Sequence, residues 1–267
     1  IPITSVSEDA AYSYTVIAPD ADPGAVALTF AATTLPSWLS FDVATQILSG
    51  TPLDAHVGTH SIVLTASDGT ETVTQSFTIT IENTNDLPLF PSVPATMPPT
   101  DATEDAAYTY TATASDDDDD VLTFAAPTLP SWLTFSAPAT ISGTPLNKHV
   151  GTHAVLMTVS DAFGTVEQSF TITVINTNDA PVFTSTTLIN SIEDAVYSYT
   201  ATASDEDGNT LTFAAPTLPS WLSFDVATQV LSGTPLNEHV GTHAVVLSAS
   251  DGTETVTQSL DIAVANT

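Results

Sequence analysis

The stretch YTYTATA, residues 108–114, decides the fold class, because its apolar side chains recur at every second position. A period of two is typical of a half-buried β-strand, and such strands are rich in Thr, Val, Ile and aromatic residues. The same alternation returns in FTITI at residues 77–81 and in FTITV at residues 170–174. Turn sequences such as SDGTE and SGTP separate the strands, and no amphipathic helical pattern is evident. The sequence therefore predicts an all-β fold.

Four sequence markers recur three times in the same order, which divides the chain into tandem repeats. They are the dipeptide Glu-Asp (from Glu8, Glu104 and Glu193), LPSWL (with Trp38, Trp132 and Trp221), GTPL (from Gly50, Gly143 and Gly233) and HVGTH (from His56, His149 and His239). Each repeat is about 90 residues long, the size of a seven-strand Ig-like β-sandwich. We expect repeat 1 over residues 1–86, repeat 2 over residues 87–179 and repeat 3 over residues 180–267, the last with a truncated linker.

The junctions between repeats are predicted to be short and stiff. The last strand of one repeat runs through Asn-Thr-Asn-Asp and a proline, Pro88 or Pro181, with no Gly/Ser-rich tether. The three sandwiches should therefore form an elongated rod. No signal peptide or bilayer-spanning apolar run is visible, and the chain is expected to be a piece of a longer protein.

The charge balance excludes several classes of partner. The formal net charge is −30, from 31 acidic residues against one basic residue, Lys148. Binding to nucleic acid needs Lys and Arg to neutralise phosphates, and attraction to an anionic membrane needs them too. The carboxylates must be balanced by water, salt or metal cations. There are no cysteines, so disulfides cannot stiffen the chain.

The acidic residues gather at matching places in each repeat. One group follows the second expected strand, at Asp20 and Asp22, Asp116 and Asp118, and Asp205 and Asp207. Others are Asp68, Asp161 and Asp251, the early glutamates, and the junctional Asn-Asp pairs. Calcium takes six to eight oxygen ligands, mostly carboxylates and carbonyls. The pattern therefore predicts hard-cation sites at the ends of the repeats.

These motifs resemble cadherin-like repeats, and more closely the dystroglycan-type cadherin-like domains of large bacterial surface adhesins. The resemblance covers each repeat and rests on EDAxYxYT, LPSWLxF, SGTPLxxxVGTH, SDG and NTNDxP. It implies calcium between consecutive domains and an extracellular, cell-surface location. At junction 1–2 the implied ligands are Glu8, Asp54, Asn85, Asp86, Asp116, Asp118 and Asp161. At junction 2–3 they are Glu104, Asn178, Asp179, Asp205, Asp207 and Asp251.

The repeats also depart from the cadherin pattern. Asn83 and Asn176 replace the first linker Asp, Leu87 and Ala180 replace the last linker Asn, and Asn147 and Asn237 stand where repeat 1 has Asp54. Asn83 and Asn176 are weaker candidate ligands. We expect two calcium ions at each junction, with three as an alternative. The outer half-sites, with Asp20, Asp22 and Asp68 at one end and Glu193 at the other, should bind weakly or stay empty.

Other interpretations of the same residues remain open. The acidic turns could belong to a halophile-like surface, and Asp119 and Asp120 are expected to be solvated. The His pairs of HVGTH could bind zinc but fit structural turns better. The LPSWL tryptophans could stack on sugars but fit the core better. No repeated catalytic arrangement is visible, so the chain is not expected to be an enzyme.

The predicted function is that of a calcium-rigidified extracellular spacer or adhesion segment of a large bacterial surface protein. Its expected partners are calcium and the neighbouring repeats, with a glycan or cell-surface protein as a possible ligand. The alternative is a glycan- or protein-binding module in which calcium has a supporting role. Neither interpretation involves nucleic acid or direct insertion into a membrane.

Overall fold

The computed structural model describes residues 1–19, 27–91 and 97–267, so Asp20 and Asp22 lie outside the described residues. Repeat 1 contains β1 (Ser5–Ser7), β2 (Tyr12–Thr15), β3 (Thr29–Thr34), β4 (Leu39–Asp42), β5 (Ile47–Gly50), the 3-10 helix η1 (Asp54–His56), β6 (Gly58–Ser67) and β7 (Thr72–Glu82). Repeat 2 contains β8 (Asp101–Thr103), β9 (Tyr108–Thr111), β10 (Thr123–Thr128), β11 (Leu133–Ser136), β12 (Thr140–Gly143), η3 (Asn147–His149), β13 (Gly151–Ser160) and β14 (Thr165–Ile175). Repeat 3 contains β15 (Val182–Phe183), β16 (Asn190–Ile192), β17 (Tyr197–Thr200), β18 (Ala203–Ser204), β19 (Thr212–Thr217), β20 (Leu222–Asp225), β21 (Val230–Gly233), η4 (Asn237–His239), β22 (Gly241–Ser250) and β23 (Thr255–Ala265).

Each repeat is a sandwich of a four-stranded and a three-stranded sheet. In repeat 1 the strand orders are β1-β7-β6-β3 and β2-β5-β4, and repeats 2 and 3 repeat this arrangement. The first strand of the larger sheet is parallel to the last, whereas the long strands β6 and β7 pair antiparallel. The prediction of an all-β fold with seven-strand Ig-like sandwiches is confirmed, and repeat 3 adds the short pair β15 and β18.

The core of each sandwich is built from the inward-facing residues of the alternating strands. In repeat 1 the fully buried side chains include Leu48, Ile62 and Ile79, which come from both sheets. Repeats 2 and 3 have equivalent cores. The period-two pattern therefore places one face of each strand in the core and the other in solvent.

The LPSWL tryptophans belong to these cores. Trp38, Trp132 and Trp221 are at most 8% exposed, and each packs edge-to-face against the first tyrosine of the second strand. Burial of this kind leaves no indole face for a sugar. The prediction that these residues are core side chains is confirmed.

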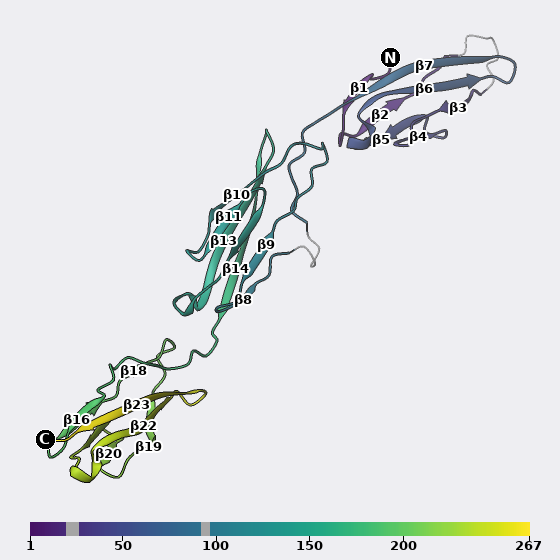
Figure 1. Ribbon diagram of the computed structural model, residues 1–267. Helices are drawn as coiled ribbons and strands as arrows, with labels where there is room; N and C mark the ends of the chain where they lie inside the picture. The colour runs from purple at the N-terminus through teal and green to yellow at the C-terminus, as the bar shows by residue number, and fades with distance from the viewer. Residues whose placement is uncertain (20–26, 92–96) are drawn as a thin grey trace.

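The three sandwiches lie in a row and are joined by two extended linkers (Figure 1). Residues 83–88 and 176–181 have no regular secondary structure. In the first linker Leu87 packs on repeat 2: a Cβ added to Gly164 would meet its Cδ2 atom at 2.3 Å. None of the helical segments in the described residues is long and apolar enough to cross a membrane.

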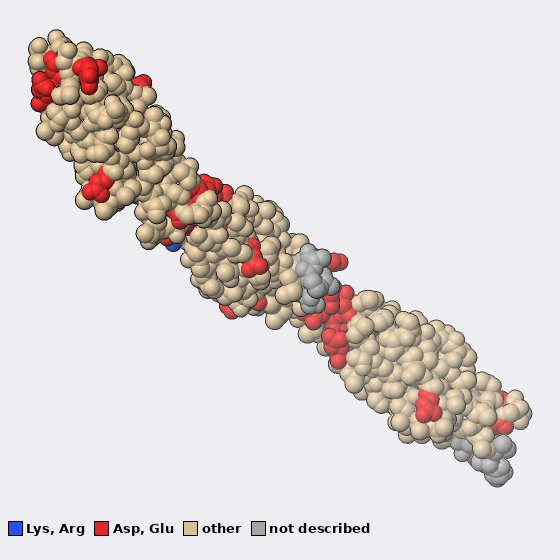
Figure 2. All heavy atoms as spheres, turned by 90° about the horizontal axis from the view of Figure 1, so that it is seen from below, with Lys and Arg blue, Asp and Glu red and all other residues tan. Residues whose placement is uncertain are grey.

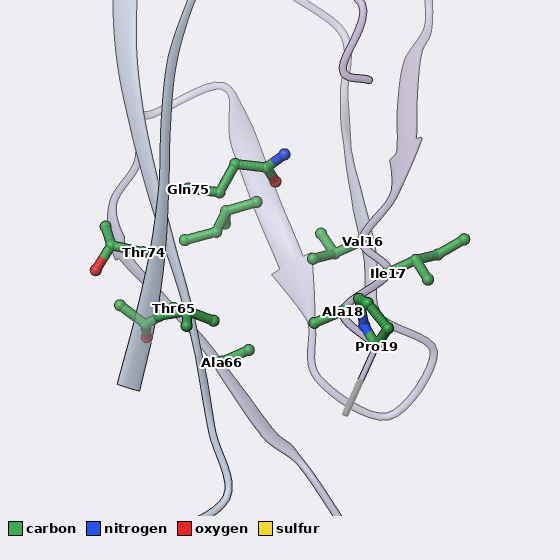
Figure 3. Close-up of a pocket in the computed structure, with 10 residues that line it drawn as sticks. Val16, Ile17, Ala18, Pro19, Thr65, Ala66, Thr74 and Gln75 are labelled. Carbon is green, nitrogen blue, oxygen red and sulfur yellow. The ribbon is translucent and has the colours of Figure 1, made fainter. Parts of the chain in front are cut away.

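The sandwiches differ at the edge of the smaller sheet. In repeat 2 an isolated bridge joins Leu89 to Ser115, and in repeat 3 β15 pairs with β18 at the corresponding place. In repeat 1 no described residue occupies that place, and a pocket remains open between residues 16–19 and the strands β6 and β7 (Figure 3).

Candidate metal centres between the repeats

The glutamate near the start of repeat 1 points into junction 1–2. Glu8 follows β1 in a tight turn, in which Asp9 has φ = 57° and its N–H donates to the Pro52 carbonyl at 2.8 Å. Asp tolerates this left-handed conformation better than most residues. Glu8 is only 3% exposed, and its Oε1 accepts a hydrogen bond from the Thr84 N–H at 2.6 Å. Its Oε2 is buried and has no hydrogen-bond donor among the described residues.

The first linker is hydrogen-bonded to two loops of repeat 2. The Asp86 N–H donates to Asp118 Oδ2 at 2.6 Å, and Asn83 Nδ2 donates to Asp118 Oδ1 at 2.8 Å. Asn85 Nδ2 donates to Asp161 Oδ2 at 3.1 Å. Three donors of the linker therefore bind carboxylates of the next repeat. The Asp86 carbonyl accepts from Asn85 Nδ2 at 2.8 Å, and the Asp86 carboxylate is available as a ligand.

The loop after β9 presents carboxylates at alternate positions. Asp116 Oδ1 accepts the N–H groups of Asp118 at 3.1 Å and Asp120 at 3.2 Å, which folds the loop around the first aspartate. Asp116 Oδ2 is buried and has no donor in the described part of the chain. Asp118 and Asp120 are half-buried, whereas Asp117 and Asp119 are exposed. The alternation points three carboxylates to one side of the loop.

These carboxylates form two groups that share Asp118. One group joins Glu8 and Asp54 of repeat 1 to Asp118 of repeat 2, and the other joins Asp116, Asp118 and Asp120. Within each group the candidate ligand oxygens lie within 4.8 Å of one another. Red Asp and Glu side chains accordingly gather where the repeats meet (Figure 2).

The concentration of charge shifts the proton affinities of several groups. Desolvation, followed by repulsion from Asp118, raises the pKa of Asp86. Desolvation, followed by repulsion from Asp116, raises the pKa of Asp120. By contrast, the Gly164 N–H holds the pKa of Asp161 below its usual value. Clustered carboxylates that resist ionisation in this way indicate a place where a cation would be stabilising.

Junction 2–3 repeats this arrangement with the next set of residues. Glu104 is 3% exposed, its Oε2 accepts the Thr177 N–H at 3.1 Å, and its Oε1 is buried with no donor from the residues that the structure describes. Here one carboxylate oxygen each from Glu104, Asp179 and Asp207 forms a group whose members lie within 4.8 Å of one another. Desolvation and repulsion from Asp207 raise the pKa of Asp179.

The second linker makes the same contacts as the first. The Asp179 N–H donates to Asp207 Oδ2 at 2.7 Å, and Asn176 Nδ2 donates to Asp207 Oδ1 at 2.8 Å. Asn178 Nδ2 donates to Asp251 Oδ2 at 2.9 Å. Asp205 Oδ1 accepts the Asn209 N–H at 3.1 Å, and no described residue donates to its buried Oδ2.

The two junctions differ at two positions. Asn147 stands where junction 1–2 has Asp54, and its Nδ2 is buried with no acceptor among residues 1–19, 27–91 and 97–267. Rotating this amide by half a turn would place its oxygen there instead, since the two orientations differ only in the assignment of N and O. Asn209 stands where repeat 2 has Asp120, and it is exposed. Junction 2–3 therefore offers fewer carboxylates.

Predicted ligands that share a contact or a carboxylate group across a junction are Glu8, Asp54, Asn85, Asp86, Asp118 and Asp161 at the first and Glu104, Asn178, Asp179, Asp207 and Asp251 at the second. Asp116 and Asp205 lie two residues before Asp118 and Asp207 in the same loops. That these residues bind calcium stays a prediction. Asp120 was expected to be solvated, but the structure places it half-buried in a carboxylate group. The alternate spacing of Asp116, Asp118 and Asp120 could have identified it. A loop that folds around its first aspartate places these three side chains on one side. Asn83 and Asn176, the weaker candidates, contact carboxylates of the following repeat.

The outer positions lack such partners. Asp68 accepts the N–H groups of Thr70 and Glu71, both at 2.7 Å, within its own loop. Glu193 Oε1 accepts from the Thr267 N–H and hydroxyl, at 2.9 and 2.8 Å. Neither side chain belongs to a group of three candidate metal ligands among the described residues.

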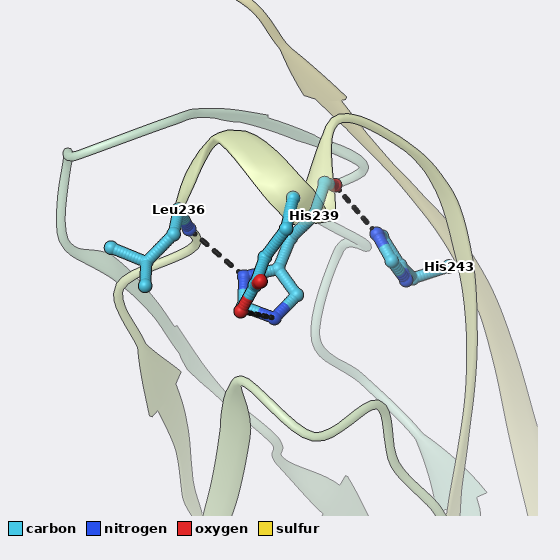
Figure 4. Close-up of polar contacts among 4 residues, drawn as sticks. Leu236, His239 and His243 are labelled. Atoms are coloured by element: carbon cyan, nitrogen blue, oxygen red, sulfur yellow. Dashed lines mark hydrogen bonds and ion pairs between the residues drawn. The ribbon is translucent and has the colours of Figure 1, made fainter.

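The histidines of HVGTH have structural contacts. His239 Nδ1 accepts the Leu236 N–H at 2.9 Å, and His243 Nε2 lies 2.7 Å from the His239 carbonyl (Figure 4). Repeats 1 and 2 have the same contacts. Because these ring nitrogens engage the backbone of the turn, the interpretation as structural histidines is confirmed.

The donor set at both junctions consists of oxygens, with a buried carboxylate oxygen that lacks a donor in each. Such a set fits a hard divalent cation, because Ca²⁺ takes carboxylate, amide and backbone oxygens in flexible geometry. It does not fit zinc, which favours His and Cys ligands.

Comparisons with known proteins agree with the repeat structure. The family described as "Putative Ig domain" matches three times, over residues 1–82, 90–175 and 180–265. The serine-rich adhesin for platelets of Staphylococcus aureus (strain USA300) is 33% identical over 150 residues, which are 54% of this chain and 6% of that relative. The matched stretch is thus a small part of the relative's length.

Solved structures are also similar to the whole chain. The protocadherin Gamma B2 extracellular cadherin domains 1–5 are 18% identical, with a TM-score of 0.49, over 100% of this chain and 59% of that one. An endo-fucoidan hydrolase of glycoside hydrolase family 107 is 23% identical, with a TM-score of 0.32, over 100% of this chain and 43% of that one. These values carry no argument about function.

Proposed function

The chain belongs to the "Putative Ig domain" family, and from this premise we propose that it is a calcium-rigidified extracellular spacer or adhesion segment of a large bacterial surface protein. Its units would be residues 1–86, 87–179 and 180–267. The similarity to a staphylococcal adhesin supports an adhesion or spacer role for the repeats. Calcium would bind between the units and hold them in line.

One observation carries the metal assignment. Glu8 and Glu104 are each 3% exposed, each has a carboxylate oxygen without a donor among the described residues, and each belongs to a group with two other carboxylates. Burying an unpaired charge is costly unless a counter-charge is supplied. With a single basic residue in the whole chain, a metal cation is the counter-charge that fits.

The proposed ligands come from the linkers, from the loops of the following repeat that the linkers contact, and from the turns of the preceding repeat. At junction 1–2 they are Glu8, Asp54, Asn85, Asp86, Asp116, Asp118, Asp120 and Asp161. At junction 2–3 they are Glu104, Asn147, Asn178, Asp179, Asp205, Asp207 and Asp251. We propose two ions at each junction. The second ion should bind more weakly at junction 2–3, because Asn209 replaces Asp120.

The charges explain why the metal would act as a stiffener. Two carboxylates about 4 Å apart repel by about 1 kcal/mol in water and by about 4 kcal/mol at an effective dielectric constant of 20. Without metal, this repulsion acts between carboxylates on opposite sides of each linker. A bound dication would attract the carboxylates on both sides of the linker, replacing this repulsion by attraction, and would so join the repeats.

Small-angle scattering with calcium and with EDTA tests the proposal. With calcium we expect the protein to have one well-defined maximum dimension. With EDTA we expect the distribution of distances within the protein to broaden as the junctions bend. Identical scattering and identical melting temperatures in the two conditions would rule the proposal out. Sodium chloride of equal ionic strength controls for a generally acidic, salt-stabilised surface, which would respond equally to both salts.

Two variants assign the effect to the junctions. Glu8→Gln and Glu104→Gln keep the side-chain shape and remove the buried charge, so each should weaken calcium binding by about tenfold, or about 1.4 kcal/mol. Glu193→Gln is the matched control, because Glu193 is also buried but belongs to no ligand group. Isothermal titration calorimetry measures all three.

The adhesin similarity also favours a second candidate, a module that binds a glycan or a cell-surface protein with calcium in support. A glycan array and a panel of surface proteins test it. Binding that is lost on substitution of surface loops, with scattering unchanged by EDTA, would favour this candidate over the spacer.

A further inference from the structure

The pocket of repeat 1 is an apolar groove along the edge of the smaller sheet. Residues 16–19 form one wall, and Leu64 to Ala66 of β6 with Val73 to Gln75 of β7 form the other (Figure 3). Val16 and Ile17 lie across from Thr74 and Gln75 in this view. Within the groove Ile17 is 80% exposed and Val73 is 63% exposed.

The chain itself fills this groove in repeat 2. The Leu89 N–H donates to the Ser115 carbonyl at 2.7 Å, and the Ser115 N–H donates back to Leu89 at 3.0 Å. The next residue, Phe90, packs against Phe124 with ring centroids 6.3 Å apart. The segment that does this is the linker from repeat 1.

In repeat 3 the preceding linker makes the equivalent contacts. Val182 and Phe183 pair antiparallel with Ser204 and Ala203, and Phe183 packs against Phe213 at 6.2 Å. Two residues on, Ser185 contacts the Tyr199 hydroxyl at 2.7 Å. Both occupants share the sequence pattern Asn-Asp-x-Pro-aliphatic-Phe.

Burial at matched positions shows what the occupant covers. Tyr110 and Tyr199 are buried, at 7% and 6% exposed, whereas the corresponding Tyr14 is only half-buried. Val166 and Val256 are half-buried, whereas Val73 is exposed. The last strand of repeat 1 is otherwise of the same length and register as those of repeats 2 and 3. The difference is therefore confined to the groove.

The backbone of the groove offers acceptors for an incoming strand. The Ser115 and Thr202 carbonyls accept from the occupants in repeats 2 and 3, and their counterparts in repeat 1 are Pro19 and Ile17. No hydrogen bond involves either carbonyl among the described residues. Pro19 has no N–H, so the return bond made by Ser115 cannot form, and an occupant would pair here with one bond fewer.

We propose that this groove of repeat 1 is a docking site for an extended peptide segment of the pattern Asp-x-Pro-aliphatic-Phe, the type of segment that joins the three repeats of this chain. The segment would lie antiparallel to residues 16–19, donate to the Ile17 and Pro19 carbonyls, and place its Phe beside Phe30, the counterpart of Phe124 and Phe213. The residues after the Phe would then cover Tyr14 and Val73, as Ser185 contacts Tyr199 in repeat 3. A second copy of the chain is a poorer occupant, because its own two segments of this type are already seated in repeats 2 and 3. The proposal does not depend on metal.

A labelled peptide with the sequence of residues 178–186 (NDAPVFTST) tests the proposal by fluorescence polarisation against the whole chain. We expect saturable binding, and at least tenfold weaker binding of the same peptide with Phe183→Asp. In the protein, Val73→Glu should weaken binding at least tenfold, because it places a charge against the apolar segment. Val43→Glu is the matched control: Val43 is 60% exposed in the same repeat but does not line the groove.

Amide chemical shifts locate the peptide. Changes at residues 14–19 and 64–75 support the proposal, and changes confined to repeats 2 or 3 overturn it. It is also overturned by the absence of saturable binding, by equal binding of the Phe183→Asp peptide, or by equal effects of the two protein variants. Dimers that Val73→Glu dissolves, seen by sedimentation in the absence of peptide, would identify a second copy as the occupant instead.

Discussion

Three glycines stand where no larger residue fits. A Cβ built on Gly143 would lie 1.9 Å from the Trp132 carbonyl oxygen, and Gly50 and Gly233 meet Trp38 and Trp221 at 2.0 and 1.9 Å. The contact is with backbone, which cannot rotate away. The glycine of GTPL therefore lets the strand that carries it pack on the strand that follows the tryptophan.

Gly143→Ala should destabilise repeat 2 by about 3 kcal/mol or more, because two paired strands must move apart. For a domain of this size, that lowers the melting temperature by roughly 10–20 °C. Thermal unfolding followed by Trp fluorescence measures the change. Ser142→Ala on the same strand is the control and should stay within about 0.5 kcal/mol; equal effects of the two substitutions would contradict the steric argument.

A second residue-scale prediction concerns alkaline pH. Burial raises the pKa of Tyr12, Tyr108 and Tyr197 from 10.0 to about 12, and each hydroxyl donates to a carbonyl of the segment just before the first strand of the larger sheet. The folded protein thus keeps protons that the unfolded chain releases above pH 10. Stability is unaffected below pH 10 and should fall between pH 10 and 12, by up to about 1.4 kcal/mol per pH unit for each tyrosine.

Urea unfolding at a series of alkaline pH values, with tyrosinate absorbance as a second probe, measures this fall. Tyr108→Phe should remove one part of the pH dependence while lowering stability at neutral pH through the lost bond to Pro99. If all tyrosines of the folded protein ionised near pH 10, the prediction would fail.

Among the elements, the short helices η1, η3 and η4 distinguish the junctions. Asp54 opens η1 with a carboxylate, whereas Asn147 opens η3 with an amide whose Nδ2 is buried without an acceptor. Asn147→Asp should therefore tighten calcium binding at junction 2–3 by about tenfold, which corresponds to about 1.4 kcal/mol. Calorimetric titration measures it.

Asn237→Asp is the matched control for this substitution. Asn237 opens η4 in repeat 3 but is exposed and belongs to no ligand group among the described residues. It should leave calcium binding unchanged. In EDTA, Asn147→Asp should lower the melting temperature, since it adds a negative charge to the junction; a gain in stability without calcium would contradict the charge argument.

The strands and the repeats could be predicted from the sequence because both depend on local pattern. Alternation in residues 108–114 and the thrice-repeated markers are sufficient for the sandwich. Asp120 was missed because a run of five aspartates shows no preference for one side until the loop has folded around Asp116. The open groove of repeat 1 was missed for a similar reason, because it depends on contacts between segments distant in sequence.

At the scale of the whole molecule, calcium should stabilise the tandem more than its parts. Each junction takes ligands from two repeats, so residues 87–179 alone would keep the group of Asp116, Asp118 and Asp120 but lack Glu8 and Asp54 at one end and Asp207 at the other. Ligand at about 100 times its dissociation constant stabilises by about 2.7 kcal/mol per site. We expect calcium to raise the melting temperature of repeat 2 more within residues 1–267 than in isolation; calorimetry on both proteins, with magnesium as the control ion, measures this.

The parallel pairing of β1 with β7 has a mechanical consequence. Ser5, Val6 and Ser7 pair in order with Thr80, Ile81 and Glu82, and the same arrangement joins β8 to β14 and β16 to β23. Tension on the two ends of a repeat pulls these strands in opposite directions along their length. Their hydrogen bonds are then loaded together in shear, instead of opening one after another from an end. Each repeat therefore resists extension through this parallel strand pair, which lies where the chain enters and leaves the repeat.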